Sequence, residues 1–386
     1  MTEVDDQIAR NQIELEHHPS GDSGRAVALY NLACSLVGKF LETNDIADLE
    51  QAIALHQSAL DLRPPSDSHR STSLNGLTVC LSYRYDVQGT VADLEQAITH
   101  GRAALQLRPP GHSERFTTLH NLADCLRKKF LKLGANADLD EAISLHQLAL
   151  VHRPPGRSNW SDSLHDLTLC FSYRHDKQGT IADLEQAITL GRATLELSPP
   201  GHSGRAMTLY NLACDLRKRF VTSGANDDLN EAISLHRSAL DLRPSGHPQR
   251  FSSLHDLANC FSYQYDEQGT IADLEQAITL GRAALELHPP DHTDRATALY
   301  NLACYLRNRF LNLGVNGDLD EAILLHQSAL DLRPLGHSKW LDSLHSLAVC
   351  FSDWYDKQGT MTDLEQAITL GRAALELSLQ AFLNVS

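Results

Sequence analysis

The sequence predicts an all-α fold in which antiparallel pairs of helices stack one after another. A fixed period runs through the 386 residues, each period contains two amphipathic helix patterns, and these patterns carry start and stop signals. Neither helix of a pair can bury its apolar stripe alone, whereas stacked copies bury a continuous core. The repetition itself therefore indicates the architecture.

The period is 45 residues long. An Asp-Leu dipeptide recurs with this spacing, without insertion or deletion, at Asp48, Asp93, Asp138, Asp183, Asp228, Asp273, Asp318 and Asp363. Alternate copies resemble each other more than neighbours do, because the segment GTIADLEQAITLGRA of residues 179–193 returns unchanged at residues 269–283. The larger unit is thus a 90-residue pair of repeats.

The first helix pattern of each period, here called the outer helix, is expected to begin at the repeated aspartate. An aspartate there can cap the free N–H groups of the first turn, and Gln96 three residues after Asp93 completes a capping box. Apolar residues follow at helical spacing: Leu94, Ala97, Ile98, Ala104, Leu105 and Leu107. A proline is expected to end the helix, at Pro64, Pro109, Pro154, Pro199, Pro244, Pro289 and Pro334.

The second pattern, here called the inner helix, is well seen in the segment RAMTLYNLACDLRKRF of residues 205–220. Its apolar stripe contains Leu209, Leu212, Ala213, Leu216 and Phe220. A residue that tolerates the left-handed conformation of a helix C-cap comes next in all eight copies: Asn44, Gly89, Gly134, Gly179, Gly224, Gly269, Gly314 and Gly359.

These repeats resemble tetratricopeptide (TPR) repeats. The segments LYNLACDL and DLNEAISLHRSALDLRP carry the resemblance, and Ala232, Ala239 and Pro244 keep the family's spacing. The period is longer than the usual length of about 34 residues, and it looks like that of fungal TPR arrays found with CHAT-type protease domains. The resemblance implies a right-handed α-solenoid whose concave groove binds an extended peptide or a helix.

The resemblance covers nearly the whole chain, so residues 1–386 are expected to form a single TPR-like solenoid. It would hold about eight 45-residue helix pairs, a partial outer helix over residues 3–18 and a terminal outer helix over residues 363–380. Leu379 and Phe382 would leave an apolar end exposed. Such an end favours an alternative function, a self-associating regulatory module of a larger CHAT-protease-like signalling protein, with homo-oligomers formed through the ends of the solenoid.

Charge and hydropathy exclude some partners. The chain has 49 acidic residues against 33 Lys and Arg, a net charge of −16. This balance argues against a general nucleic-acid or membrane-surface binder, which needs a basic footprint. The sequence contains neither an apolar run of about 18 residues nor an apolar signal core near its start, so a cytoplasmic location is expected.

The residues capable of chemistry recur with the scaffold. His56, His146, His236 and His326 are one position repeated every 90 residues, whereas a catalytic site is normally a single break in such symmetry. Glycine-rich phosphate loops and GxSxG or HExxH motifs are missing, so we expect no enzyme activity, no cofactor and no metal site. The cysteines form no CxxC pair and are expected to be buried as small apolar residues: Cys34, Cys80, Cys125, Cys170, Cys214, Cys260, Cys304 and Cys350.

One face of the inner helices is the candidate binding surface. Tyr210, Asn211, Cys214 and Arg217 are spaced to share a face away from the leucine stripe. The resemblance implies that this face lines the concave groove and binds a protein or peptide. Across the array it comprises Tyr30, Asn31, His120, Asn121, Arg127, His165, Tyr210, Asn211, Arg217, His255, Tyr300, Asn301, Arg307 and His345. The same residues could instead pack between inner helices, and the sequence leaves both readings open.

Overall fold

The computed structural model describes residues 3–151, 160–287, 294–333 and 339–383, with side chains up to residue 377. Within these ranges the regular structure consists of seventeen α-helices. The outer helices are α1 (Glu3–His17), α3 (Ile46–Asp61), α5 (Val91–Gln106), α7 (Asn136–Val151), α9 (Ile181–Glu196), α11 (Asn226–Asp241), α13 (Ile271–Glu286), α15 (Asn316–Asp331) and α17 (Met361–Leu383). The inner helices are α2 (Arg25–Thr43), α4 (Arg70–Gln88), α6 (Arg115–Leu133), α8 (Trp160–Gln178), α10 (Arg205–Ser223), α12 (Arg250–Gln268), α14 (Arg295–Leu313) and α16 (Trp340–Gln358).

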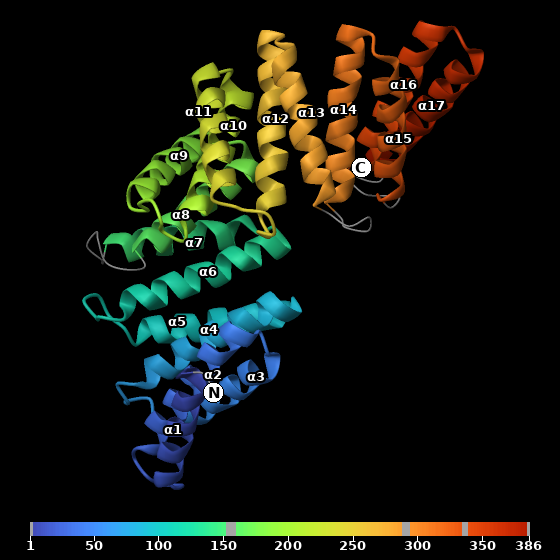
Figure 1. The fold of residues 1–386 in the computed structure, drawn as a ribbon. Helices are drawn as coiled ribbons and strands as arrows, with labels where there is room; N and C mark the ends of the chain where they lie inside the picture. Colours follow the sequence, from blue (N-terminus) through green and yellow to red (C-terminus); the bar gives the residue numbers. More distant parts are fainter. Residues whose placement is uncertain (1–2, 152–159, 288–293, 334–338, 384–386) are drawn as a thin grey trace. The chain divides into compact units, whose positions relative to one another are not determined.

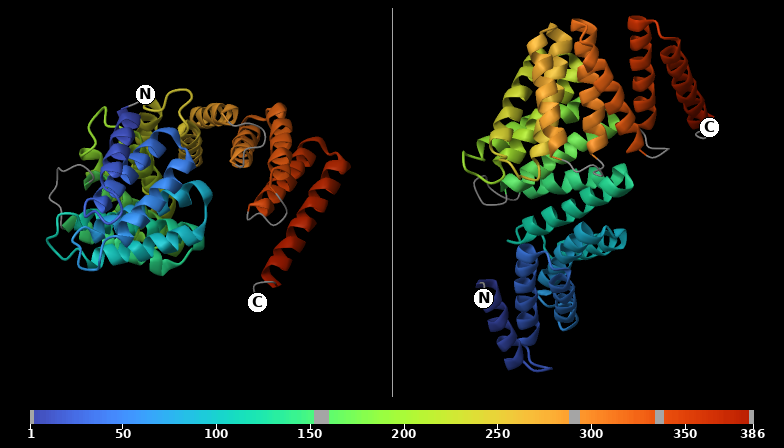
Figure 2. Two further views of the ribbon diagram at one scale, coloured as in Figure 1. Left: turned by 90° about the horizontal axis from the view of Figure 1, so that it is seen from below. Right: turned by 45° about the vertical axis from the view of Figure 1, so that its right-hand side comes forward.

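The helices form two compact units, residues 1–198 with α1 to α9 and residues 199–386 with α10 to α17. Within each unit, helices that follow one another along the chain pack together, and each inner helix also contacts the next inner helix of its unit (Figure 1). The order of α12, α13 and α14, side by side, is the same in two further views (Figure 2). The predicted all-α array of antiparallel helix pairs is confirmed, and no described helix is long and apolar enough to cross a membrane.

The predicted apolar stripes form the core. Leu209, Leu212, Ala213, Leu216 and Phe220 are all buried. The outer helix buries its predicted stripe as well, except at its end, where Leu105 is half-buried and Leu107 is exposed. Leu107 lies one residue beyond α5, as its C-cap. The expectation that Leu107 belongs to the core was therefore wrong, because the helical register ends before it.

Both predicted stop signals can be located in the structure. Gly89 follows α4 with φ +69°, and Asn44 follows α2 with φ +56°, so both adopt the left-handed conformation that ends these helices. The outer helices end before the repeated proline, as α3 does at Asp61 ahead of Pro64. Three of the seven prolines, Pro154, Pro289 and Pro334, lie outside the described residues.

The predicted starts of the outer helices were wrong by three positions. Helix α5 begins at Val91 with Thr90 as its N-cap, so Asp93 is the third residue of the helix and does not cap it. The Asp93 carboxylate instead pairs with Arg84, nine residues earlier on α4, at 2.6 Å. The aspartate is thus a buried ion-pair partner that fixes the inner helix to the outer helix after it.

This ion pair recurs along the chain. The described copies are Lys39–Asp48, Arg84–Asp93, Lys129–Asp138, Arg174–Asp183, Arg219–Asp228 and Arg309–Asp318. Asp273 differs, because Gln264 occupies the position nine residues before it. Burial raises the pKa of Asp273 above its ordinary value, which indicates that its charge is poorly compensated.

The cysteine prediction holds for five of the eight residues. Cys80, Cys125, Cys170, Cys260 and Cys350 are buried. Cys214 and Cys304 are half-buried and Cys34 is exposed, so the prediction was wrong for Cys34. Within the 45-residue period, these three cysteines stand one residue before the position of the five buried cysteines. The difference of one residue turns their side chains away from the leucine stripe of the inner helix.

We expect the ion pair to contribute measurably to stability. Asp93→Asn removes the charge that pairs with Arg84 and should lower the free energy of unfolding by about 1–3 kcal/mol. Asp273→Asn is the matched control and should cost less than about 0.5 kcal/mol, because Asp273 has no arginine nine residues earlier. Urea denaturation followed by circular dichroism measures both. Equal losses would contradict the assigned role.

Candidate peptide-binding face

The inner face, defined here as the side of the inner helices that carries the predicted binding residues, is mostly half-buried. Only Asn31 and His345 among the fourteen predicted residues are exposed. The other twelve lie between neighbouring inner helices or against an outer helix. Their environment, and in most cases their partners, can therefore be stated residue by residue.

Side chains of successive inner helices join across the face at a regular spacing of 46 residues, one repeat plus one. We call these contacts the seam. In the first unit Asn121 donates to Asn75 at 3.2 Å, and Lys128 donates to Ser82 at 2.8 Å. Lys128 also pairs with Asp86 at 2.7 Å. The seam thus ties α4 to α6 by polar contacts beside the apolar core.

The second unit repeats this arrangement with other residue types. The Tyr210 hydroxyl donates to Asp256 at 2.5 Å, and Arg217 lies 3.5 Å from the other oxygen of that carboxylate. Two repeats later the Tyr300 hydroxyl meets the Ser346 hydroxyl at 3.1 Å. Asn301 lies 3.4 Å from His255 and donates to Asn259 at 2.8 Å. Arg307 donates to Asp353 at 2.5 Å.

Aromatic contacts anchor the seam to the outer helices. The Tyr210 ring packs against His236 of α11 with ring centroids 5.5 Å apart, and the Arg243 guanidinium lies 4.8 Å from the Tyr210 centroid. Tyr30 packs in the same way against His56 and Arg63, and Tyr300 against His326 and Arg333. At the equivalent place in α6, His120 packs against His146 at 5.6 Å.

The outer-helix histidines of these clusters are neutral at physiological pH. Burial lowers the pKa of His56, His236 and His326 from 6.5 to about 4, and that of His146 to about 3. Both ring nitrogens of His146, His236 and His326 are buried without a hydrogen-bond partner among the described residues. The four histidines of this repeated position are thus buried between helices.

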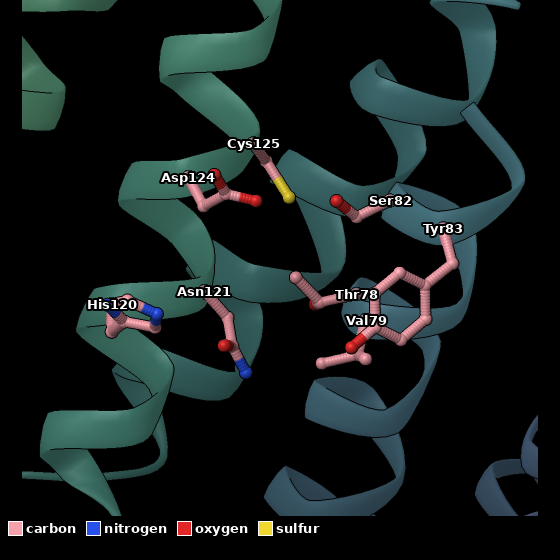
Figure 3. Close-up of a pocket in the computed structure, with 8 residues that line it drawn as sticks. All are labelled: Thr78, Val79, Ser82, Tyr83, His120, Asn121, Asp124 and Cys125. Atoms are coloured by element: carbon pink, nitrogen blue, oxygen red, sulfur yellow. The ribbon is translucent and has the colours of Figure 1, made fainter. Parts of the chain in front are cut away.

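A pocket of about 130 Å³ opens between α4 and α6 (Figure 3). Residues of α6 form one wall and residues of α4 the other, as Figure 3 shows. Two predicted binding residues, His120 and Asn121, belong to the α6 wall. The complete lining is Thr78, Val79, Ser82, Tyr83, His120, Asn121, Asp124 and Cys125.

An equivalent pocket of about 340 Å³ lies between α14 and α16 in the second unit. Six of its lining residues occupy the repeat positions of Val79, Ser82, Tyr83, His120, Asn121 and Asp124, five repeats later. They are Cys304, Arg307, Asn308, His345, Ser346 and Val349, and buried His326 completes the wall. The pocket is thus a property of the repeat, and sequence spacing alone did not reveal it.

Some predicted residues stand apart from the seam. Asn31 is exposed and uses its backbone carbonyl to accept from Asn11. Arg127 pairs with Asp124 on its own helix. His165 and Asn211 are half-buried. The sequence did not predict the acidic, hydroxyl and amide partners on this face, among them Asn75, Ser82, Asp124, Asn259, Ser346 and Asp353.

Comparisons with known proteins concern the fold. No protein-family model and no curated protein matches the chain. A structure of nearly identical TPR-like repeats of a Podosopora anserina kinesin light chain is 21% identical, covers 54% of this chain and 94% of its own, and has a TM-score of 0.39. YrrB, a TPR protein with an unusual peptide-binding site, is 19% identical over 60% and 96% of the two chains, at a TM-score of 0.39. The C-terminal part of a TPR repeat-containing protein from Cytophaga hutchinsonii is 16% identical over 81% and 99%, at 0.49.

The buried histidines predict a sensitivity to acid. A histidine that titrates near 6.5 when unfolded and near 4 when folded makes the unfolded chain bind more protons between these values. Stability should therefore be complete above pH 6.5 and fall as the pH drops toward 4. His236→Phe keeps a ring beside Tyr210 and should reduce this slope by up to about one proton.

Urea denaturation at several pH values measures the slope. His112→Phe serves as the control for the replacement of an exposed histidine. An unaltered slope in His236→Phe would show that the folded protein protonates His236 as readily as the unfolded chain.

Proposed function

We propose that this protein is a non-catalytic scaffold that binds an extended peptide or a helix along its inner face. The observation that carries the proposal is the recurrence of one pocket at equivalent repeat positions in both units. Each pocket could receive one side chain of a partner that lies along the inner helices of its unit.

The chemistry of the pockets suits a protein ligand. Amide, hydroxyl and imidazole groups of Asn121, Ser82 and His120 offer donors and acceptors to main-chain groups. Tyr83 adds an aromatic ring with a polar end, a common interface anchor. The seam pairs acids with bases across the face, so a partner of mixed charge meets no large field of one sign.

The thiols and imidazoles of the inner face are poorly placed for nucleophilic catalysis. Burial raises the pKa of Cys125, which lines the first pocket, to about 12, and that of Cys304, which lines the second, to about 11. Both are therefore thiols at neutral pH, whereas the thiolate is the nucleophile. These positions support a binding role.

The self-association alternative has weaker support. It was predicted from Leu379 and Phe382, whose side chains lie outside those that the structure describes. Membership of a larger CHAT-protease-like protein rests on the sequence resemblance alone. We therefore favour peptide binding, in a protein expected to be cytoplasmic.

The substitution Ser346→Asp is expected to fill the pocket between α14 and α16. It introduces a residue type that the chain already has at the equivalent position of another unit. Ser346→Asp gives α16 the residue that α12 carries as Asp256, where Tyr210 and Arg217 hold the carboxylate. The Tyr300 hydroxyl, which already meets Ser346, can donate to the new carboxylate as Tyr210 does to Asp256, while Arg307 remains paired with Asp353. Peptides that bind the wild-type chain through this pocket should lose about tenfold or more in affinity, the loss of one hot-spot contact.

The experiment selects peptides from a random displayed library on the full chain and measures their affinities by fluorescence anisotropy. Arg282→Ala is the control, because Arg282 pairs with Glu321 between two outer helices at an exposed site. Ser82→Asp tests the first pocket in parallel. The proposal fails if the selected peptides tolerate both pocket substitutions and lose affinity with Arg282→Ala.

A further inference from the structure

One cluster breaks the symmetry of the array. The position occupied by Tyr30, Tyr210 and Tyr300 is a histidine, His120, in the remaining 90-residue unit. His120 of α6 lies beside His146 of α7, and its Nδ1 is 3.7 Å from Asp166 Oδ2 of α8. Ligand atoms of these three side chains lie within 4.8 Å of one another, the one such group found among the described residues.

We propose that His120, His146 and Asp166 bind a single Zn²⁺ ion between α6, α7 and α8. Two imidazole nitrogens and a carboxylate oxygen form a donor set that Zn²⁺ takes in proteins, with a fourth tetrahedral position left for water or for a ligand from a partner. The three residues lie 26 and 20 positions apart, so no local motif announces the site.

His146 supplies an observation independent of the clustering. Its side chain is 0% exposed, and neither ring nitrogen has a hydrogen-bond partner in the part of the chain that the structure describes. A buried imidazole without a partner loses the hydrogen bonds that it made in water. Coordination through one nitrogen would compensate for that loss, and the low pKa of His146 keeps its lone pair free of a proton at neutral pH.

The other two side chains can move to complete the coordination. Zinc ligands at about 2.1 Å from the metal lie roughly 3.4 Å apart, closer than the present limit of 4.8 Å. The side chains of His120 and Asp166 are 23% and 17% exposed, so both have room to rotate. Ser163 Oγ lies 3.1 Å from His120 Nδ1, and this contact would be replaced by the metal if Nδ1 is the ligand atom.

The charges near the cluster allow a cation. Arg127 is the guanidinium that could repel the metal, but it forms an ion pair with Asp124 on the same helix. Lys128 pairs with Asp86 as well as with Asp124. Asp166 is the carboxyl group outside these pairs; burial raises its pKa, and a bound cation would favour its charged form.

The related units explain why the site is single. Tyr210, His236 and Asp256 occupy the same positions, but a phenol stands where the second imidazole is needed, and its hydroxyl donates to the aspartate. In the next unit Tyr300 and His326 meet Ser346, which lacks the carboxylate. These two sets of equivalent residues, each lacking one proposed ligand, can therefore serve as controls within the same chain.

The test titrates Zn²⁺ into the full-length, chelator-treated protein against a chromophoric competitor, with Co²⁺ absorption as a second reading of tetrahedral coordination. Wild type should bind one ion strongly. His120→Tyr installs the residue of the other three units, so the fold should persist. It should weaken this binding by more than about 100-fold, since loss of an outer partner alone costs 10–100-fold.

Two further substitutions, made in the related units, test which residues a site requires. Tyr210→His should create a second site with His236 and Asp256, whereas Tyr300→His should not, because Ser346 offers no carboxylate. Weak binding at exposed groups such as His17 and Cys34 is common to all variants and cancels in the comparison. Equal Zn²⁺ affinity and stoichiometry in wild type and His120→Tyr would overturn the proposal. A strong added site in Tyr300→His would overturn the requirement for the aspartate.

The Zn²⁺ proposal has a test of its own, although His120 also lines the first pocket. Zn²⁺ should raise the melting temperature of wild type and leave that of metal-free His120→Tyr unchanged, whether or not a peptide is present. Loss of peptide binding in Ser346→Asp and loss of Zn²⁺ binding in His120→Tyr are separate outcomes, so each proposal can fail alone.

Discussion

All contacts between neighbouring repeats depend on a step of 45 residues that never changes. One inserted residue within an inner helix would turn every later side chain by about 100° around the helix axis, and the apolar stripe and the seam would both leave their partners. This dependence explains why the array contains no insertion or deletion from Asp48 to Asp363. The constraint acts on the spacing, whereas the residue types on the inner face vary from copy to copy.

Because the residue types on the inner face can vary while the spacing stays constant, the face differs chemically from one unit to the next. The leucines and alanines of the stripe are almost the same in each unit, so the positions beside them are held at fixed places by a constant scaffold. At one such set of positions three of the four units carry Tyr–His–Asp, Tyr–His–Ser or His–His–Asp, while the unit of Tyr30 carries Tyr–His–Gly. The first forms a hydrogen-bonded seam, the second leaves a pocket, and the third gathers ligands suited to a metal ion.

The sequence predicted the helices and their ends well where the signal is local. Glycine or asparagine after the inner helix marks a left-handed residue wherever it occurs, and Gly89 and Asn44 behave alike. It failed at Asp93 because an aspartate suits either the N-cap or the first turn of a helix, and only Arg84 decides between them. A basic residue nine positions before the repeated aspartate, in six of eight copies, was the available signal.

The inner face was located from spacing, but its pairings could not be predicted. Partners 46 residues apart meet only because neighbouring inner helices are displaced along their axes, and no sequence period reports that displacement. For the same reason, the sequence did not predict the pockets or the short distance between His120 and Asp166. Helical periodicity identifies a face, whereas the relative placement of two helices decides what that face can bind.

The most direct test of this account is a double-mutant cycle on Tyr210 and Asp256, which meet across the seam at 2.5 Å. Urea denaturation of wild type, Tyr210→Phe, Asp256→Ala and the double variant gives their coupling free energy. A hydrogen bond to a charged, half-buried carboxylate should yield about 1–3 kcal/mol. A coupling indistinguishable from zero would mean that the repeats are joined by their apolar stripes alone, and the account of the seam would be wrong.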